Sequence, residues 1–135
     1  MNIIFGAAGA GHGVEHAKVT AALLNEVQPY LIFTNTIHAS EGCALYDDMK
    51  NGLFIEPDFE EYIAEEETFL SDLQMHNAEY YGIHPANVLQ LHGQLPQDKE
   101  NLLAELRSQR DAAPKELLKS RPKRLDGEGL IMNWN

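Results

Sequence analysis

Residues 3–13, with the sequence IIFGAAGAGHG, decide how this chain begins to fold. An apolar run from Ile3 to Phe5 is followed at once by a series of glycines, a pattern typical of a strand that turns sharply into a helix. From Val14 onward, apolar residues recur at steps of three and four, which predicts an amphipathic helix that Pro29 ends. The predicted inward face of this helix consists of Val14, Ala17, Ala21, Leu24 and Val27.

A second strand is predicted directly after this helix, over residues 30–36. Its first half is apolar through Leu31, Ile32 and Phe33, and its end is polar. Two strands joined by a crossover helix form a βαβ unit, which favours a parallel sheet. The class of fold predicted from this pattern is therefore α/β.

The middle of the chain contains signals for a loop with a short helix, a long helix and a third strand. A loop and short helix are expected over residues 38–52. Asp58 follows a proline and has Glu61 three positions on, a spacing that predicts a capping box. The predicted buried stripe of the helix that starts there is Phe59, Tyr62, Ile63, Phe69, Leu70 and Leu73, with its glutamates facing water. A third strand is expected within residues 79–91, interrupted at His84 and Pro85.

The C-terminal part of the chain differs from the rest in charge. A helix is predicted after Pro96, with Leu102, Leu103 and Leu106 facing inward, and Pro114 breaks it. A short helix is expected around 116–118, and the apolar residues Leu130, Ile131 and Trp134 could dock on the body. The last third is basic: it contains Arg107, Arg110, Lys115, Lys119, Arg121, Lys123 and Arg124. We therefore divide the chain into a body, 1–113, and a basic tail, 114–135.

Composition and charge limit the classes of partner that the chain can bind. The chain has 135 residues and a net charge of −11, so one acidic domain is expected, and binding of nucleic acid or anionic membranes by its body is disfavoured. No apolar run approaches the ~20 residues that span a bilayer, and no signal-peptide pattern is present, so a cytoplasmic location is expected. The single cysteine, Cys43, cannot form an intramolecular disulfide.

Several short motifs follow one another in a fixed order over about residues 3–107. They are Gly6-x-x-Gly9-x-Gly11-His12 before a helix with Glu15, His16 and Thr20; Leu24-Asn25-Glu26-x-x-Pro29; Glu41-Gly42-Cys43-Ala44-Leu45-Tyr46 with Lys50-x-Gly52-x-Phe54; and His84-x-x-Asn87, followed by Gly93-x-Leu95-Pro96-x-Asp98-Lys99 and the paired Leu102 and Leu103. In this order and spacing the chain resembles the C-terminal portion of the radical S-adenosylmethionine (radical SAM) superfamily, specifically its bacterial iron-sulfur oxidoreductases.

The resemblance implies a fold and a site. Members of the superfamily have a partial or full β/α barrel whose active site lies at the carboxyl ends of the parallel strands. The expected fold is therefore a partial (β/α) barrel with about three mainly parallel strands and flanking helices. By the same resemblance, the backbone is expected to approach S-adenosylmethionine at Gly6, Gly9 and Gly11. Polar contacts in the substrate cleft are expected from Asn35, His84 and Asn87.

The chain departs from the superfamily in its cysteines. Radical SAM catalysis requires a Cys-x-x-x-Cys-x-x-Cys loop that holds a [4Fe-4S] cluster. Cys43 is the only cysteine and lies outside any such motif. We therefore expect the chain not to be catalytic alone by this mechanism, and expect a missing N-terminal half to carry the cluster. The chain would then be a truncated product, one half of a split enzyme or an expressed fragment.

Other interpretations of the same residues remain open. The glycines also suit a tight turn that needs positive φ angles, or a phosphate-binding βαβ module that uses backbone N–H groups. His12 and His16 share a helix face, but a solvated helix start explains them better than a metal site does. A noncatalytic interaction domain is a further alternative, because an open parallel sheet exposes an edge and an apolar face that self-association would cover.

Overall fold

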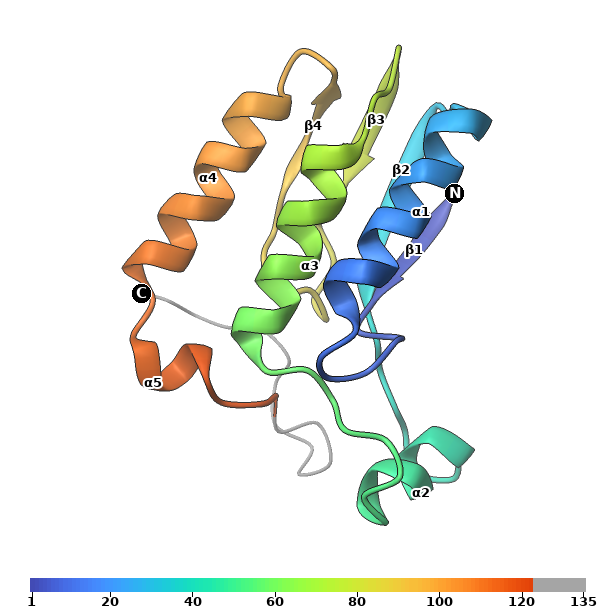
Figure 1. The fold of residues 1–135 in the computed structure, drawn as a ribbon, viewed down its shortest axis with the longest axis vertical. Helices are drawn as coiled ribbons and strands as arrows, with labels where there is room; N and C mark the ends of the chain where they lie inside the picture. The colour runs from blue at the N-terminus through green and yellow to red at the C-terminus, as the bar shows by residue number, and fades with distance from the viewer. Residues whose placement is uncertain (123–135) are drawn as a thin grey trace.

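The computed structural model of the chain describes residues 1–122 and contains the predicted strands and helices together with one further strand (Figure 1). In chain order they are β1 (Asn2–Phe5), α1 (Gly13–Val27), β2 (Leu31–Thr36), α2 (Ala44–Lys50), α3 (Phe59–Asp72), β3 (Ala78–Tyr81), β4 (His92–Leu95), α4 (Lys99–Ala112) and α5 (Lys115–Leu118). The prediction of an α/β class is confirmed. Leu130, Ile131 and Trp134 lie outside the described residues.

Within residues 1–122, four strands form one sheet in the order β1-β2-β3-β4. β1, β2 and β3 are parallel, and β4 pairs antiparallel with β3. The mostly parallel sheet was predicted, but the single interrupted strand expected over 79–91 is wrong. The structure has two strands there, joined by a loop over residues 82–91 that contains no crossover helix, and a direct loop of this kind joins antiparallel neighbours.

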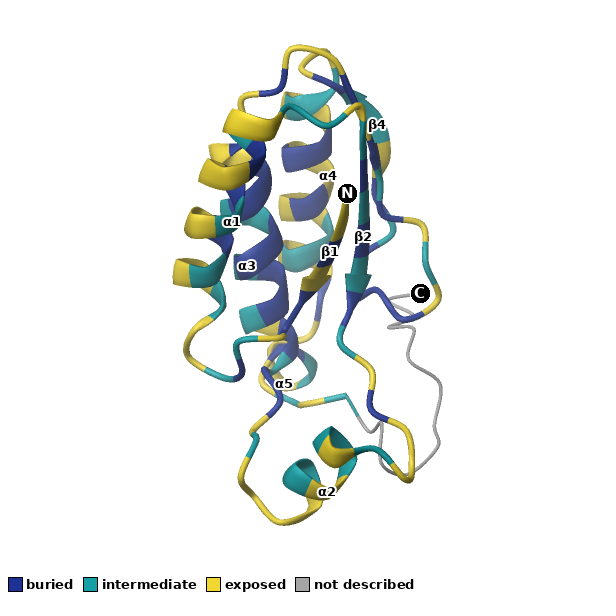
Figure 2. Cartoon of the chain, turned by 90° about the vertical axis from the view of Figure 1, so that its right-hand side faces the viewer, coloured by how far each residue is buried: buried dark blue, intermediate teal, exposed yellow. Residues whose placement is uncertain are grey.

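The long helices all lie on one side of the sheet. Figures 1 and 2 show α1, α3 and α4 packed side by side against the same face, and no helix of the described chain lies on the other. The buried strand side chains that face the helices include Ile3, Phe5, Ile32, Tyr80 and Leu95. We call the opposite side the open face; strand alternation places on it Asn2, Ile4, Leu31, Phe33, Asn35, Glu79, Tyr81, His92 and Gln94. The described sheet is open and does not close into a barrel.

The helix boundaries follow local signals. The predicted capping box of α3 is confirmed: Asp58 Oδ1 accepts from the Glu61 N–H at 2.8 Å, and the Glu61 carboxylate accepts from the Asp58 N–H at 2.8 Å. α1 ends one residue before Gln28, which has a left-handed φ of 52°. Its buried face is narrower than predicted, because Val14 and Val27, in its first and last turns, are exposed.

The described part of the predicted basic tail packs on the body. α5 forms where a short helix was expected, and its Leu118 is buried. The Ser120 carbonyl accepts from the Phe59 N–H at 3.1 Å, and Arg121 Nε donates to the Glu56 carbonyl at 2.8 Å. These bonds join the segment after α5 to the start of α3.

The segment between β2 and α3 projects from the carboxyl ends of the strands. Figure 2 shows α2 beyond the end of the sheet, apart from the helical layer. None of its residues is buried. The Ile55 carbonyl that follows it accepts from the Ala10 N–H at 2.9 Å, so this excursion returns over the glycine-rich loop after β1.

Candidate functional site

A hollow of about 630 Å³ lies on the open face at the carboxyl ends of β1 and β2. Ligands of open α/β sheets bind in crevices at the carboxyl ends of the strands, which makes this place a candidate site. We call it the strand-end hollow. Its lining residues are Ile4, Phe33, Asn35, Thr36, Ile37, His38, His84, Pro85 and Ala86.

The hollow brings together two of the residues expected to contact substrate, Asn35 and His84. Asn35 lies opposite Ile4 in the β1–β2 register, and its Nδ2 donates to Asn2 Oδ1 at 2.8 Å. Its Oδ1 is shielded from solvent and has no hydrogen-bond partner within residues 1–122. A buried acceptor without a donor costs about 1–3 kcal/mol, so a donor that reaches it would be stabilised.

His84 is held in one tautomer when it is neutral. Its Nδ1 accepts from the Ala86 N–H at 3.1 Å, so the ring proton of the neutral form lies on Nε2. The ring packs edge-on to Phe33, with 6.2 Å between the centroids. This histidine, which lines the hollow together with Asn35, therefore offers an N–H donor in its neutral form.

Asn87, also predicted for the cleft, does not line the hollow. It is 2% exposed, and its Nδ2 donates at 2.8 Å to the carbonyls of both Thr34 and Gly82. Its Oδ1 accepts from Thr36 Oγ1 at 3.2 Å. The side chain is thus engaged on both its donor and acceptor sides, and it ties the 82–91 loop to β2. Asn87 positions the loop that carries His84.

The N–H groups of the three glycines expected at the cofactor are already occupied. The Gly6 N–H donates to Glu65 Oε2 at 2.9 Å, and the Gly11 N–H donates to Glu61 Oε1 at 2.7 Å. The Gly9 N–H donates to the Gly6 carbonyl at 3.0 Å. A phosphate would have to displace two carboxylates of the same protein, which argues against the phosphate-binding interpretation.

Contacts within the chain itself account for the presence of glycine at two of these three positions. Gly6 has a φ of 84°, and a Cβ there would lie 2.4 Å from the Tyr62 ring. At Gly9, also at positive φ, the space is bounded by the chain's own Phe54 and Ile55. A Cβ at Gly11 would meet nothing within 4 Å. Of the three glycines expected at the cofactor, Gly11 alone faces open space.

The carboxylates that hold this loop were not predicted, because the glutamates of α3 were expected to face water. Glu65 is 0% and Glu66 is 4% exposed. Glu65 Oε1 also lies 3.0 Å from His16 Nδ1. Burial raises the pKa of the Glu65 carboxyl, opposed by its bonds to His16 and Gly6. A signal was present for Glu66, which falls on the apolar stripe three residues after Ile63 and three before Phe69.

Glu66 points to a different strand from its neighbour. Its Oε1 accepts from the Tyr80 hydroxyl at 2.7 Å inside the core. Burial raises the pKa of Glu66 to about 7, and the adjacent Glu65 carboxyl acts in the same direction. The pKa of Tyr80 is also raised, first by burial and then by the Glu66 charge. The pair is part of the core and does not reach the open face.

The described residues contain no group of three or more His, Cys, Asp or Glu side chains that could hold a metal ion. His16, considered with His12 as a possible metal ligand, is instead bonded to Glu65. Cys43 is a free, partly exposed thiol at the start of α2. Nor is any helix within residues 1–122 both long and apolar enough to span a lipid bilayer.

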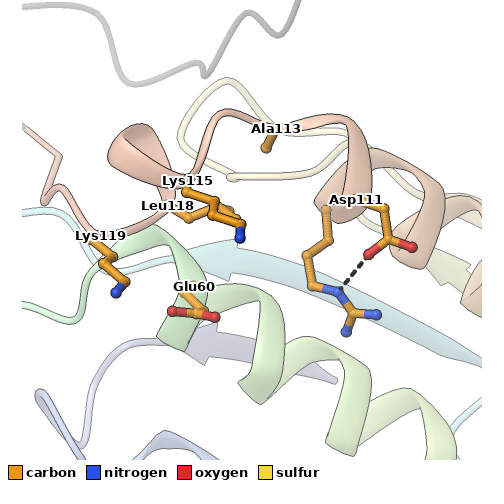
Figure 3. Close-up of a pocket in the computed structure, with 7 residues that line it drawn as sticks. Glu60, Asp111, Ala113, Lys115, Leu118 and Lys119 are labelled. Carbon is orange, nitrogen blue, oxygen red and sulfur yellow. Dashed lines mark hydrogen bonds and ion pairs between the residues drawn. The ribbon is translucent and has the colours of Figure 1, made fainter.

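A second hollow, of about 460 Å³, lies in the helical layer between the start of α3 and the ends of α4 and α5 (Figure 3). Its lining residues are Glu60, Arg110, Asp111, Ala113, Lys115, Leu118 and Lys119. Arg110 is engaged by Glu67 at 2.6 Å and by Asp111 at 3.4 Å. None of the residues predicted for a functional site lines this hollow, so we place the candidate site at the strand ends.

Compared with protein-family models, curated proteins and solved structures, the chain gives no significant match. The resemblance to the radical SAM superfamily therefore depends on the sequence motifs alone.

Proposed function

We propose that this chain forms the C-terminal part of a radical SAM oxidoreductase and supplies one wall of its S-adenosylmethionine and substrate cleft. The observation that supports this most is the one-sided sheet, which has helices on one face and the strand-end hollow on the other. Parallel sheets usually have both faces covered or close into a barrel. An uncovered face with a hollow at the strand ends suits a surface that further strands complete.

The residues of the hollow fit the organic cofactor better than the glycine loop does. Asn35 and His84 line the hollow with the apolar Ile4 and Phe33 and offer an acceptor and a donor, whereas the N–H groups of Gly6 and Gly11 are occupied. In the superfamily, S-adenosylmethionine bound to the cluster supplies the radical. The residues of this chain bind and orient the reactants and shield them from water.

The described residues do not fit the iron-sulfur cluster. A cluster takes three or four thiolates, and the whole sequence contains one cysteine. We therefore propose that a separate cluster-bearing segment completes the site, and that the isolated chain has no radical SAM activity. Catalytic residues within this chain are left unassigned.

Calorimetric titration of S-adenosylmethionine tests this function. It is added to the purified chain and to the chain mixed with a cluster-bearing N-terminal half of a radical SAM oxidoreductase, such as one encoded upstream of Met1 or in a neighbouring gene. We expect binding in the mixture that is weakened at least tenfold by His84→Ala but not by Tyr30→Ala, an exposed residue outside the hollow. Binding to neither sample would remove the cofactor assignment.

A noncatalytic, self-associating domain is the second candidate, and the open face favours it too. Ile4 is 44% exposed, and β1 and β4 are sheet edges. A second copy could cover this surface. Sedimentation velocity at two or more concentrations tests the idea: a dimer dissociated by Ile4→Lys would support it, and a clean monomer would exclude it.

A further inference from the structure

Three aromatic rings lie side by side across the open face. Phe33 of β2 is the register partner of Tyr81 of β3, which is in turn the partner of His92 of β4. The Phe33 and Tyr81 rings stack with 5.5 Å between centroids and 13° between planes, and Tyr81 and His92 are 5.0 Å apart. We call Phe33, Tyr81 and His92 the aromatic row.

The aromatic row leads into the strand-end hollow. Phe33 belongs to both, and the His84 ring packs edge-on against it at 6.2 Å. No helix of the described chain covers this side of the sheet (Figure 2). Partly exposed, preordered rings of this kind present flat apolar surface at little entropic cost, which suits stacking with another planar group.

The charges around the aromatic row exclude one class of ligand. Neither the open face nor the lining of the hollow contains a lysine or arginine within the described residues. Before Lys99 the sequence has only Lys18 and Lys50, and the net charge is −11. Glu79 Oε1 lies 2.9 Å from His92 Nε2 and adds an acidic group at the far end of the row. An anionic ligand would meet repulsion here without a counter-charge.

We propose that the open face binds the substrate through a planar aromatic group that is uncharged or cationic. The ring stacks on Phe33 and Tyr81, and a cationic centre gains cation–π attraction and the field of Glu79. The assignment of this ligand as the substrate rests on the proposed function. The preference of the surface for uncharged or cationic over anionic rings does not depend on that function.

Nitrogen-15 NMR titrations of the full chain with three bicyclic probes test the proposal. The probes are 2-naphthol, N-methylquinolinium and 2-naphthoate, which share a shape and differ in charge. We expect the neutral and cationic probes to shift the amides of Phe33, Tyr81 and His92, and the anionic probe to bind at least tenfold more weakly. Equal or tighter binding of 2-naphthoate, shifts confined to the helical layer, or no binding would overturn it.

Variants and a direct contact measurement complete the test. Phe33→Leu is expected to lower probe affinity at least fivefold, and Tyr30→Leu, a control outside the row, to leave it unchanged. Intermolecular nuclear Overhauser effects between the probe and the Phe33 or Tyr81 ring protons of the unaltered chain do not depend on any variant folding, and their absence would refute the stacking.

S-adenosylmethionine also carries an uncharged aromatic ring, so a competition arm separates cofactor from substrate. In the mixture with the cluster-bearing half, saturating S-adenosylmethionine is expected to leave the probe bound. Displacement of the probe would assign the aromatic row to the cofactor and overturn the substrate assignment. Failure of S-adenosylmethionine to bind, with the probe selectivity intact, would remove the proposed function and keep the inferred surface.

Discussion

Glu65 accepts a hydrogen bond from the backbone N–H of Gly6 at 2.9 Å, although 59 positions separate the two residues in the sequence. The other carboxylate oxygen lies 3.0 Å from His16 Nδ1. One side chain of α3 thus contacts both the turn after β1 and the first part of α1. Together with the Glu61–Gly11 bond, it holds the glycine-rich loop from the helical side.

Replacement of Glu65 by alanine is expected to destabilise the fold by about 2 kcal/mol, because the buried Gly6 N–H loses its acceptor. Urea unfolding followed by circular dichroism measures this. Glu60→Ala, an exposed glutamate of the same helix, is the control and should change stability by less than about 0.5 kcal/mol. Equal effects of the two substitutions would contradict the role assigned to Glu65.

Alanine at Gly6 and at Gly11 should separate steric clash from backbone strain. Both residues have positive φ, 84° and 81°, but only at Gly6 would the new Cβ collide with Tyr62. We expect Gly11→Ala to cost about 1 kcal/mol and Gly6→Ala at least about 3 kcal/mol. Thermal and urea unfolding of both variants give the comparison, and a milder effect at Gly6 would show that the turn is packed differently.

The buried Glu66 predicts a pH dependence of stability. Burial raises the pKa of its carboxyl from the ordinary 4.5 to about 7 in the folded chain, so folding favours the protonated form. Its contribution is fully present below pH 4.5 and is lost as pH rises through about 7, a difference of about 3 kcal/mol. Glu66→Gln, which keeps an acceptor for Tyr80, should remove most of this loss.

Urea midpoints of the unaltered chain and of Glu66→Gln between pH 5 and 8.5 check this expectation. The variant should gain relative stability as the pH rises. Glu60→Gln provides the matched control on the exposed side of α3, and its pH profile should parallel that of the unaltered chain. A constant difference between Glu66→Gln and the unaltered chain at all pH values would contradict the raised pKa.

Substitutions at Asn87 and at His84 are expected to affect different properties, the first mainly stability and the second mainly ligand binding. Asn87→Ala leaves two carbonyls and a hydroxyl without their buried partner, which should cost about 3 kcal/mol. His84→Ala should cost about 1 kcal/mol or less and weaken ligand binding. Hydrogen exchange of the 82–91 loop supplies a second readout, since faster exchange is expected in Asn87→Ala. If Asn87→Ala were as stable as the unaltered chain but did not bind the ligand, Asn87 would be a ligand contact and not a residue that positions the loop.

Local signals in the sequence were enough to predict the elements that depend on near neighbours. The capping box at Asp58 and Glu61, the turn at Gly6 and the break at Pro114 each involve residues within a few positions. The buried roles of Glu65, Glu66 and Asn87 depend on partners from other elements. Periodicity therefore assigned the two glutamates to solvent, and the family resemblance assigned Asn87 to a cleft. Asn35 and His84 were placed near strand ends by the pattern, but only the sheet register brings them to one hollow.

The most direct test of the account is a map of where S-adenosylmethionine contacts the chain once a cluster-bearing half is present. Nitrogen-15 labelling of this chain alone, within the mixture, allows each amide shift to be assigned to one face. We expect the shifts to cluster at Asn35 and His84 and to spare the outer surface of α3 and α4. Shifts confined to the helical layer, or none at saturating cofactor, would contradict the claim that the open face is the working surface.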